Sequence, residues 1–141
     1  MRVSEIMSRD VRIADPEMSI REVASTMEQI DAGFMPVGEN DRLVGTITDR
    51  DIAIRAVGHG LGPETKVREI MTHDVKYCFE DDNLSDVAQN MAEIQVRRLP
   101  VVNRDKRLVG VISLGDIAID DDNDDDAEIA LSGISEPARM H

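Results

Sequence analysis

The stretch LVGTITDRDIAI, residues 43–54, decides the fold because it returns as LVGVISLGDIAI at residues 108–119. Earlier in each copy, identical residues recur 64 positions apart, from Val3 and Val67 to Val37 and Val101. From Arg42 and Arg107 onward the spacing is 65, so one residue is inserted in a polar segment of the kind where turns absorb insertions. The chain is therefore one motif of about 60 residues written twice.

Each copy predicts the same order of strand, helix, strand, strand and helix. Apolar residues recur at helical spacing over 20–30 and 84–94, and Ser19 and Asn83 stand where an N-cap belongs. Short apolar runs predict strands at 11–14, 34–37 and 43–48, and again at 75–79, 99–102 and 108–113. A second helix is expected directly after each last strand. The sequence predicts an α+β fold of two βαββα repeats.

These boundaries predict repeat 1 at residues 1–57, a linker at 58–66, repeat 2 at 67–119 and an acidic, flexible tail at 120–141. One repeat of about 60 residues buries little surface alone, so the two are expected to pack as a pseudo-twofold pair with two related clefts. In the tail, the acidic run that begins at Asp120 lacks the glycine and glutamate that an EF-hand loop needs at positions six and twelve. We interpret this run as hydrated charge.

Composition excludes several classes of function. The 141 residues hold 16 Lys and Arg against 29 Asp and Glu, a net charge of −13, which argues against nucleic acid or an anionic membrane as a partner. No apolar run is long enough to span a bilayer. The single cysteine, Cys78, excludes an internal disulfide, favours the cytoplasm and is expected to be a small buried hydrophobe. The three histidines lack metal-ligand spacing, so no metal site is predicted.

The openings VSEIM and VREIM, the Pro-Val pair after each first helix and the two LVG runs together resemble the CBS domain pair, or Bateman module. The resemblance covers residues 1–119, and the short chain is similar to stand-alone bacterial CBS-pair proteins, including those linked to hypoxic or stress responses. It implies the βαββα unit and binding of AMP, ADP or ATP in the clefts between repeats. It also implies a homodimer, and neither a catalytic residue nor a prosthetic group is expected.

Two short motifs are similar to the nucleotide-contacting positions of that family: Thr48-x-x-Asp51 and Ser113-x-x-Asp116. A hydroxyl beside unpartnered backbone N–H groups helps to hold a phosphate, and a carboxylate one turn later suits the paired hydroxyls of ribose. The same pattern is also an ordinary capping box, and taken alone it favours a cap. Its repetition after an LVG run favours binding.

The resemblance also implies flanking contacts. Basic side chains reach the phosphate in such sites, and here they are Arg50, Arg97 and Arg98; solvated surface charge is the alternative for each. The apolar slot for adenine is implied around Ile13, Pro36 and Pro100. Because the arginines are not placed alike in the two halves, we expect the two clefts to differ in affinity.

Three functions follow from these patterns. The first is a regulatory module that senses cellular energy or stress state through an adenosine nucleotide and acts through a target protein. The alternative is a protein–protein interaction module whose clefts stay empty. An enzyme such as a nucleotide hydrolase is disfavoured, because neither the Ser/Thr motifs nor the isolated histidines supply an activated nucleophile or a metal centre.

Overall fold

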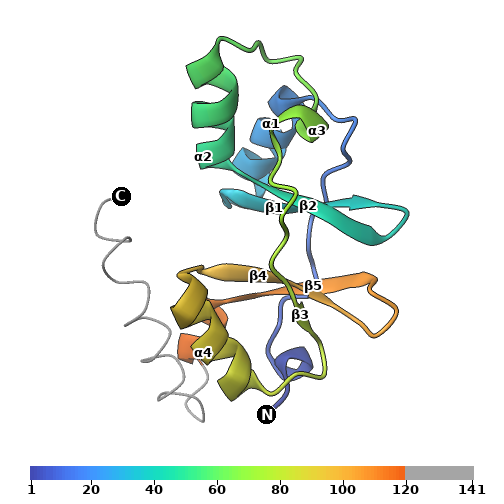
Figure 1. Cartoon of the computed structure of the whole chain (residues 1–141), viewed down its shortest axis with the longest axis vertical. Helices are drawn as coiled ribbons and strands as arrows, with labels where there is room; N and C mark the ends of the chain where they lie inside the picture. The colour runs from blue at the N-terminus through green and yellow to red at the C-terminus, as the bar shows by residue number, and fades with distance from the viewer. Residues whose placement is uncertain (120–141) are drawn as a thin grey trace. The chain divides into compact units, whose positions relative to one another are not determined.

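The computed structural model describes residues 1–119, so the acidic run predicted as a tail lies outside the described residues. The described chain forms two compact units. We call residues 11–75 the central unit, and residues 1–10 together with 76–119 the terminal unit. In each unit the helices lie on one side of the strands (Figure 1). The predicted α+β fold of two repeats is confirmed.

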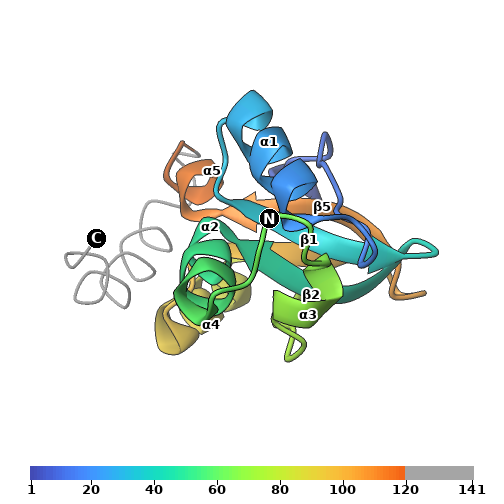
Figure 2. The same ribbon diagram turned by 90° about the horizontal axis from the view of Figure 1, so that it is seen from above.

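The central unit is built on a hairpin of β1 (Phe34–Glu39) and β2 (Arg42–Thr48). Asn40 and Asp41 form the turn with φ of 55° and 64°, as the two central residues of a type I′ turn require. Figure 2 shows α1, α2 and α3 spread over this hairpin. The helical elements are α1 (Ile20–Ile30), α2 (Asp49–Asp51), the π-helical η2 (Ile52–Ala56), the 3₁₀ turn η3 (Val57–His59) and α3 (Val67–Ile70).

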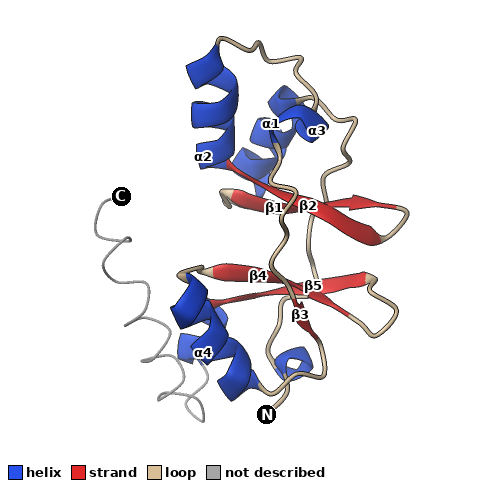
Figure 3. Cartoon of the chain, viewed as in Figure 1, coloured by secondary structure: helices blue, strands red, loops and turns tan. Residues whose placement is uncertain are grey.

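The terminal unit holds a three-stranded sheet in the order β3-β4-β5, coloured red in Figure 3. Strand β3 runs parallel to β4, and β4 runs antiparallel to β5. The opening strands are shorter than predicted: β3 has two residues, and in the central unit only Ala14 pairs, with Val37. The elements are the 3₁₀ turn η1 (Val3–Glu5), β3 (Cys78–Phe79), α4 (Leu84–Ile94), β4 (Arg98–Val102), β5 (Leu108–Ser113) and α5 (Leu114–Ile119).

The two long helices follow the predicted patterns. The Ser19 side chain accepts a hydrogen bond from the Glu22 amide at 3.2 Å, and Asn83 accepts one from the Ser85 amide at 2.8 Å, so both N-caps are confirmed. Their apolar stripes face two separate cores, with Met27 in one and Met91 in the other. Within residues 1–119, no helix is long and apolar enough to cross a membrane.

Each unit is completed by the opening segment of the other repeat. Ser8 exchanges two backbone hydrogen bonds with Val111, at 2.8 and 3.0 Å, inside the terminal unit. Thr72 does the same with Thr46, at 2.8 and 3.1 Å, inside the central unit. The compact units therefore do not coincide with the sequence repeats, because residues 1–10 and 67–75 fold with the opposite copy.

This exchange explains the glycine of each LVG run. A Cβ on Gly110 would lie 2.7 Å from the Ser8 carbonyl oxygen, and a Cβ on Gly45 would lie 2.9 Å from the Thr72 carbonyl oxygen. Atoms cannot approach this closely without displacing the opening segment. Glycine is required at both positions because the backbone of the opening segment passes directly over them.

Candidate functional site

The first predicted motif closes on itself at the end of β2. The Asp51 amide donates to Thr48 Oγ1 at 3.1 Å, and the Thr48 amide donates to Asp51 Oδ2 at 3.0 Å. Both side chains are half-buried. This reciprocal pair is a capping box, so the capping interpretation of the motif is correct for the central unit.

The second motif repeats that geometry at the end of β5. The Asp116 amide donates to Ser113 Oγ at 3.2 Å, and the Ser113 amide donates to Asp116 Oδ2 at 3.0 Å. Each cap uses one oxygen of its carboxylate as acceptor. A carboxylate has two oxygens with about four lone-pair sites. Capping therefore leaves chemical capacity for ligand hydroxyls, and the two interpretations are compatible.

The predicted apolar residues lie on the same side of each sheet as the motifs. Because side chains alternate along a strand, the residues between core positions point to the opposite face. In β4, Leu99 and Val101 belong to the core, which places Arg98 and Pro100 on the other face. We call this side, opposite the core cluster of each unit, the strand face. The strand face of the terminal unit thus carries Arg98, Pro100 and, on β5, Ser113.

The central unit has the equivalent arrangement. Met35 and Val37 belong to its core, so Phe34 and Pro36 occupy its strand face, and Thr48 lies directly across from Phe34. Pro36 and Pro100 are both buried, whereas Ile13 is 44% exposed. Pro36 and Thr48 therefore lie on one face, and Ile13 stands next to Ala14, which bridges to Val37.

The predicted arginines of the terminal unit stand next to its motif. Arg98 pairs across the strands with Ser113, and residues paired in this way have neighbouring side chains on one face. The carbonyl of Arg97 accepts from the Leu114 amide at 3.0 Å, which holds the backbone of Arg97 beside the residue that follows Ser113. Both arginine side chains are exposed. Arg98 thus places a guanidinium-bearing side chain on the face of Ser113, where it suits a phosphate, while Arg97 is held near the motif by its backbone.

The same place in the central unit has a different charge. Gly33 and Phe34 stand where the terminal unit has Arg97 and Arg98. The Asp49 carboxylate fills the space that a side chain on Gly33 would need, because a Cβ there would be 2.5 Å from Asp49 Oδ2. Asp49 replaces Leu114, which is buried in the other core. The sequence interpretation missed Asp49, although the alignment of the two repeats identifies this exchange of leucine for an acid.

Arg50 and Arg55 flank the central motif in the sequence, but the structure separates their roles. The Arg50 side chain is exposed, and its backbone amide donates to Asp49 Oδ1 at 2.8 Å. Arg55 Nη1 donates at 3.4 Å to each of the carbonyls of Ile70 and Met71, and its Nε lies 3.7 Å from Asp51 Oδ1. Arg55 therefore holds α3 against the motif, and Arg50 is the predicted phosphate contact whose side chain projects from this end of the unit.

Tyr77 and Cys78 are neighbours in the opening segment of repeat 2, and their side chains differ in exposure. Cys78 is 4% exposed, and burial, with a smaller contribution from Asp82, raises the pKa of its thiol to about 12. The prediction of a buried hydrophobe is confirmed. Tyr77 is 38% exposed and occupies the position of Ile13 in repeat 1. Tyr77 lies within residues 76–78, which the resemblance implies for the adenine slot, and the 64-residue spacing makes it the counterpart of Ile13.

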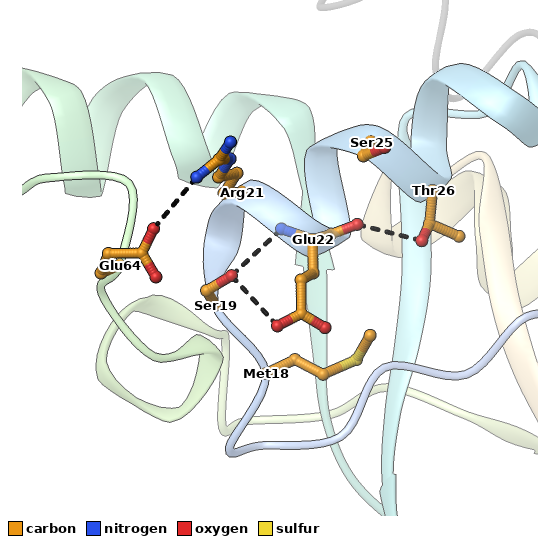
Figure 4. Close-up of a pocket in the computed structure, with 7 residues that line it drawn as sticks. All are labelled: Met18, Ser19, Arg21, Glu22, Ser25, Thr26 and Glu64. Carbon is orange, nitrogen blue, oxygen red and sulfur yellow. Dashed lines mark hydrogen bonds and ion pairs between the residues drawn. The ribbon is translucent and has the colours of Figure 1, made fainter.

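A separate depression of about 440 Å³ lies on the central unit beside the start of α1 (Figure 4). It is lined by Met18, Ser19, Arg21, Glu22, Ser25, Thr26 and Glu64, none of which belongs to the predicted site. Its polar groups bond mainly to one another: Ser19 caps Glu22, Thr26 donates to the Glu22 carbonyl at 3.0 Å, and Arg21 pairs with Glu64 at 3.5 Å. Among residues 1–119, no group of three or more His, Cys, Asp or Glu side chains is placed to hold a metal ion.

Known proteins share both the sequence and the fold. YhcV of Bacillus subtilis, a CBS domain-containing protein, is 38% identical over 133 residues, which are 94% of each chain. The crystal structure of Hypoxic Response Protein I with two coordinated zinc ions has a TM-score of 0.77 at 33% identity, and the match covers 84% of this chain and 98% of that one. The CBS domain pair of protein MJ0100, in complex with 5′-methylthioadenosine and S-adenosyl-L-methionine, has a TM-score of 0.74 at 30% identity over 84% and 94% of the chains.

The family described as CBS domain matches the chain twice, over residues 3–58 and 67–119. Both segments end beyond a Thr/Ser-x-x-Asp cap, and both contain the glycine over which an opening segment passes. The repeat, the fold and the paired motifs therefore agree, and the chain belongs to the CBS domain family as a tandem CBS pair.

Proposed function

We propose that this CBS pair is a cytoplasmic regulatory module that binds an adenosine nucleotide, AMP, ADP or ATP, and acts through a partner protein. Binding changes the packing of the pair or of a dimer, and the partner responds to that change. The carrying observation is the coincidence, in each unit, of the Thr/Ser-x-x-Asp motif and the predicted apolar residue on one strand face. The adenosine ligands of the related MJ0100 pair support this class of ligand.

The chemistry of the strand face suits such a ligand. The carboxylates of Asp51 and Asp116 accept the hydroxyl hydrogens of ribose, while the hydroxyls of Thr48 and Ser113 donate to polar atoms of the ligand, such as phosphate oxygens at Ser113. Arg97 and Arg98 add positive charge beside Ser113. These groups bind and orient a ligand. They include no paired nucleophile and base, so the proposed role is binding without catalysis.

The proposal is tested by titrating the full chain with AMP, ADP and ATP, in a calorimeter and in thermal unfolding. A ligand that binds only the native state raises the unfolding temperature as its concentration rises. After long incubation with Mg²⁺, the nucleotide should be recovered intact. A chain that no adenosine ligand stabilises would instead be an interaction module with empty clefts.

The sharpest variant is Asp116→Asn, because asparagine keeps an oxygen that can accept from the Ser113 amide but lacks the carboxylate charge. We expect nucleotide affinity to fall about 10-fold or more, the size of one charged hydrogen bond. Ser19→Ala is the matched control, since it removes an equivalent cap on α1 outside the strand face. Equal loss of affinity in both variants would show that the effect is only structural.

We also propose that the chain forms a homodimer through its second helices. Ile54 and Val57 are 48% and 68% exposed, and Leu61 beyond them is 41% exposed. Ile54 and Val57 are three residues apart on the helical stretch, and Leu61 follows its end at Gly60, so exposed apolar side chains gather at this end of the unit. Ile54→Glu should convert a dimer to a monomer in analytical ultracentrifugation, whereas Ala53→Glu on the neighbouring exposed position should have a smaller effect.

A further inference from the structure

We infer that the two strand faces select ligands of different charge. The terminal unit takes a phosphorylated adenosine ligand, and the central unit takes an adenosine ligand without phosphate, of the 5′-methylthioadenosine class. This inference rests on the proposed function and adds that the two motifs bind different classes of adenosine ligand. It follows from the side chains at four equivalent positions.

Two arginines, Arg97 and Arg98, stand next to the terminal motif in the structure. Arg98 lies across the strands from Ser113, and Arg97 is fixed by its backbone bond to Leu114. Within residues 1–119, neither guanidinium is paired with a carboxylate in the structure. Leu114, the residue that follows Ser113, is buried and uncharged. A phosphate here meets the cation of Arg98, with Arg97 held nearby by its backbone, and the carboxylate of Asp116.

The central motif has no arginine at the positions equivalent to Arg97 and Arg98, and it has the acid Asp49 at the position of Leu114. Phe34 stands across from Thr48, so the cross-strand partner of the hydroxyl is an apolar ring. Asp49 follows Thr48 directly, and its carboxylate occupies the space above Gly33. Asp49 is exposed and directly follows Thr48, so a phosphate bound at Thr48 would lie near this carboxylate as well as that of Asp51, and like charges repel each other. A ligand that ends in a neutral methylthio group would not.

The two arginines of the central unit do not restore the balance. Arg55 donates to the carbonyls of Ile70 and Met71 and lies beside Asp51, so its charge is engaged within the unit. Arg50 is exposed, and it stands between Asp49 and Asp51 in the sequence. At positions 33, 34 and 49–51 the central motif carries a net charge of −1, from Asp49, Arg50 and Asp51, whereas the equivalent positions 97, 98 and 114–116 carry +1, from Arg97, Arg98 and Asp116.

The experiment is a calorimetric titration of the full chain with AMP and, separately, with 5′-methylthioadenosine. We expect one AMP per chain at the stronger site, and 5′-methylthioadenosine to bind in the presence of saturating AMP. Two equal AMP sites per chain would overturn the inference while leaving the proposed function intact. Binding of neither ligand would overturn the inference, and if ADP and ATP also failed to bind, the proposed function would be overturned with it.

Exchanging the equivalent residues tests the assignment to each face. Arg97→Gly with Arg98→Phe gives the terminal unit the residues of the central one, and AMP affinity should fall about 10-fold or more, while 5′-methylthioadenosine affinity changes less than about twofold. Arg97→Lys with Arg98→Lys should keep most of the AMP affinity. Asp49→Asn should strengthen AMP binding at the central unit, which appears as a second AMP per chain.

Arg21→Gln is the matched control for removal of positive charge, because the Arg21 side chain is 74% exposed and pairs with Glu64, away from the strand face. It should leave both affinities unchanged. Circular dichroism and the urea midpoint establish that each variant is folded, which exposed positions such as Arg97 and Arg98 favour. Equal loss of AMP and 5′-methylthioadenosine in the arginine variant would overturn the inference.

Discussion

The central and terminal units each contain an acid–arginine ion pair, but the arginine comes from a different element in each unit. Glu17 and Asp81 occupy equivalent positions at the start of their repeats, and each binds an arginine. Glu17 binds Arg68, which belongs to α3, whereas Asp81 binds Arg104, which lies in the turn between β4 and β5. The position of the acid is retained while its partner comes from another element. In this pair of repeats the position of the acid is therefore the same, whereas the position of the arginine that neutralises it differs.

The helices after the two motifs differ as well. In the terminal unit, Ser113 is followed by the α-helix α5. In the central unit, α2 passes into the π-helical segment η2, which contains Arg55. A π-helical segment changes the direction in which side chains project, and Arg55 reaches the carbonyls at the end of α3. The π-helical segment is thus associated with a contact that the described part of the terminal unit does not have.

The largest effect is expected at the glycines that both units share. Gly110→Ala should lower the free energy of unfolding by about 3 kcal/mol, because the new methyl group would meet the Ser8 carbonyl oxygen at 2.7 Å. Gly45→Ala should cost less, about 2 kcal/mol, since the backbone oxygen that its methyl group would meet, that of Thr72, is farther away at 2.9 Å. Urea unfolding followed by circular dichroism measures both values.

Gly62→Ala is the control for this pair, because nothing lies within 4 Å of a Cβ at that position. It should change the free energy of unfolding by less than about 0.5 kcal/mol. If Gly110→Ala were as mild as Gly62→Ala, the close passage of the opening segment over the LVG glycine would be wrong.

A smaller effect is expected where the units differ. Arg55→Gln removes two charged hydrogen bonds to the end of α3, and it should lower the free energy of unfolding by about 1 kcal/mol because the arginine side chain is half exposed. Arg50→Gln, on the same helical stretch, should cost less than about 0.5 kcal/mol, since its side chain is exposed. Equal urea midpoints for the two variants would show that the hydrogen bonds from Arg55 to the end of α3 do not stabilise the protein.

The smallest effect concerns the two acid–arginine pairs and depends on pH. The hydrogen bond from Arg104 lowers the pKa of Asp81, and those from Lys66 and then Arg68 lower the pKa of Glu17. A lowered folded-state pKa stabilises the protein above the ordinary value, 3.8 for aspartate and 4.5 for glutamate, and this stabilisation is lost as the pH falls through the folded-state pKa.

Arg104→Gln and Arg68→Gln should therefore shift the urea midpoint slightly at pH 7 and less at about pH 3, where the acids take up protons. Arg104 also lies 4.2 Å from the centre of the Phe79 ring, a contact that does not require Asp81 to be charged. The pH dependence should thus be more complete for Arg68→Gln. A shift that grows toward low pH would contradict the sign of both pKa changes.

Most of the local structure could be predicted from the sequence. The helices at 20–30 and 84–94, the caps at Ser19 and Asn83 and the two hairpins follow from apolar spacing and turn residues, which act over a few positions. The opening strands were predicted too long, because an apolar run does not indicate how many of its residues find a pairing partner. The proposed site residues Thr48, Asp51, Ser113 and Asp116 follow from the family resemblance and from the repetition of their motif after each LVG run.

The sequence by itself determined the repeat, the elements within each copy and the residue types at the two motifs. Only the tertiary structure decided that each opening segment completes the opposite repeat, so that Gly45 and Gly110 must lack a side chain. It also decided that Asp49 lies over Gly33 while Arg98 faces Ser113. The physical reason is that periodicity and capping depend on neighbours in the chain, whereas steric exclusion and the charge around a motif depend on segments that only folding brings together.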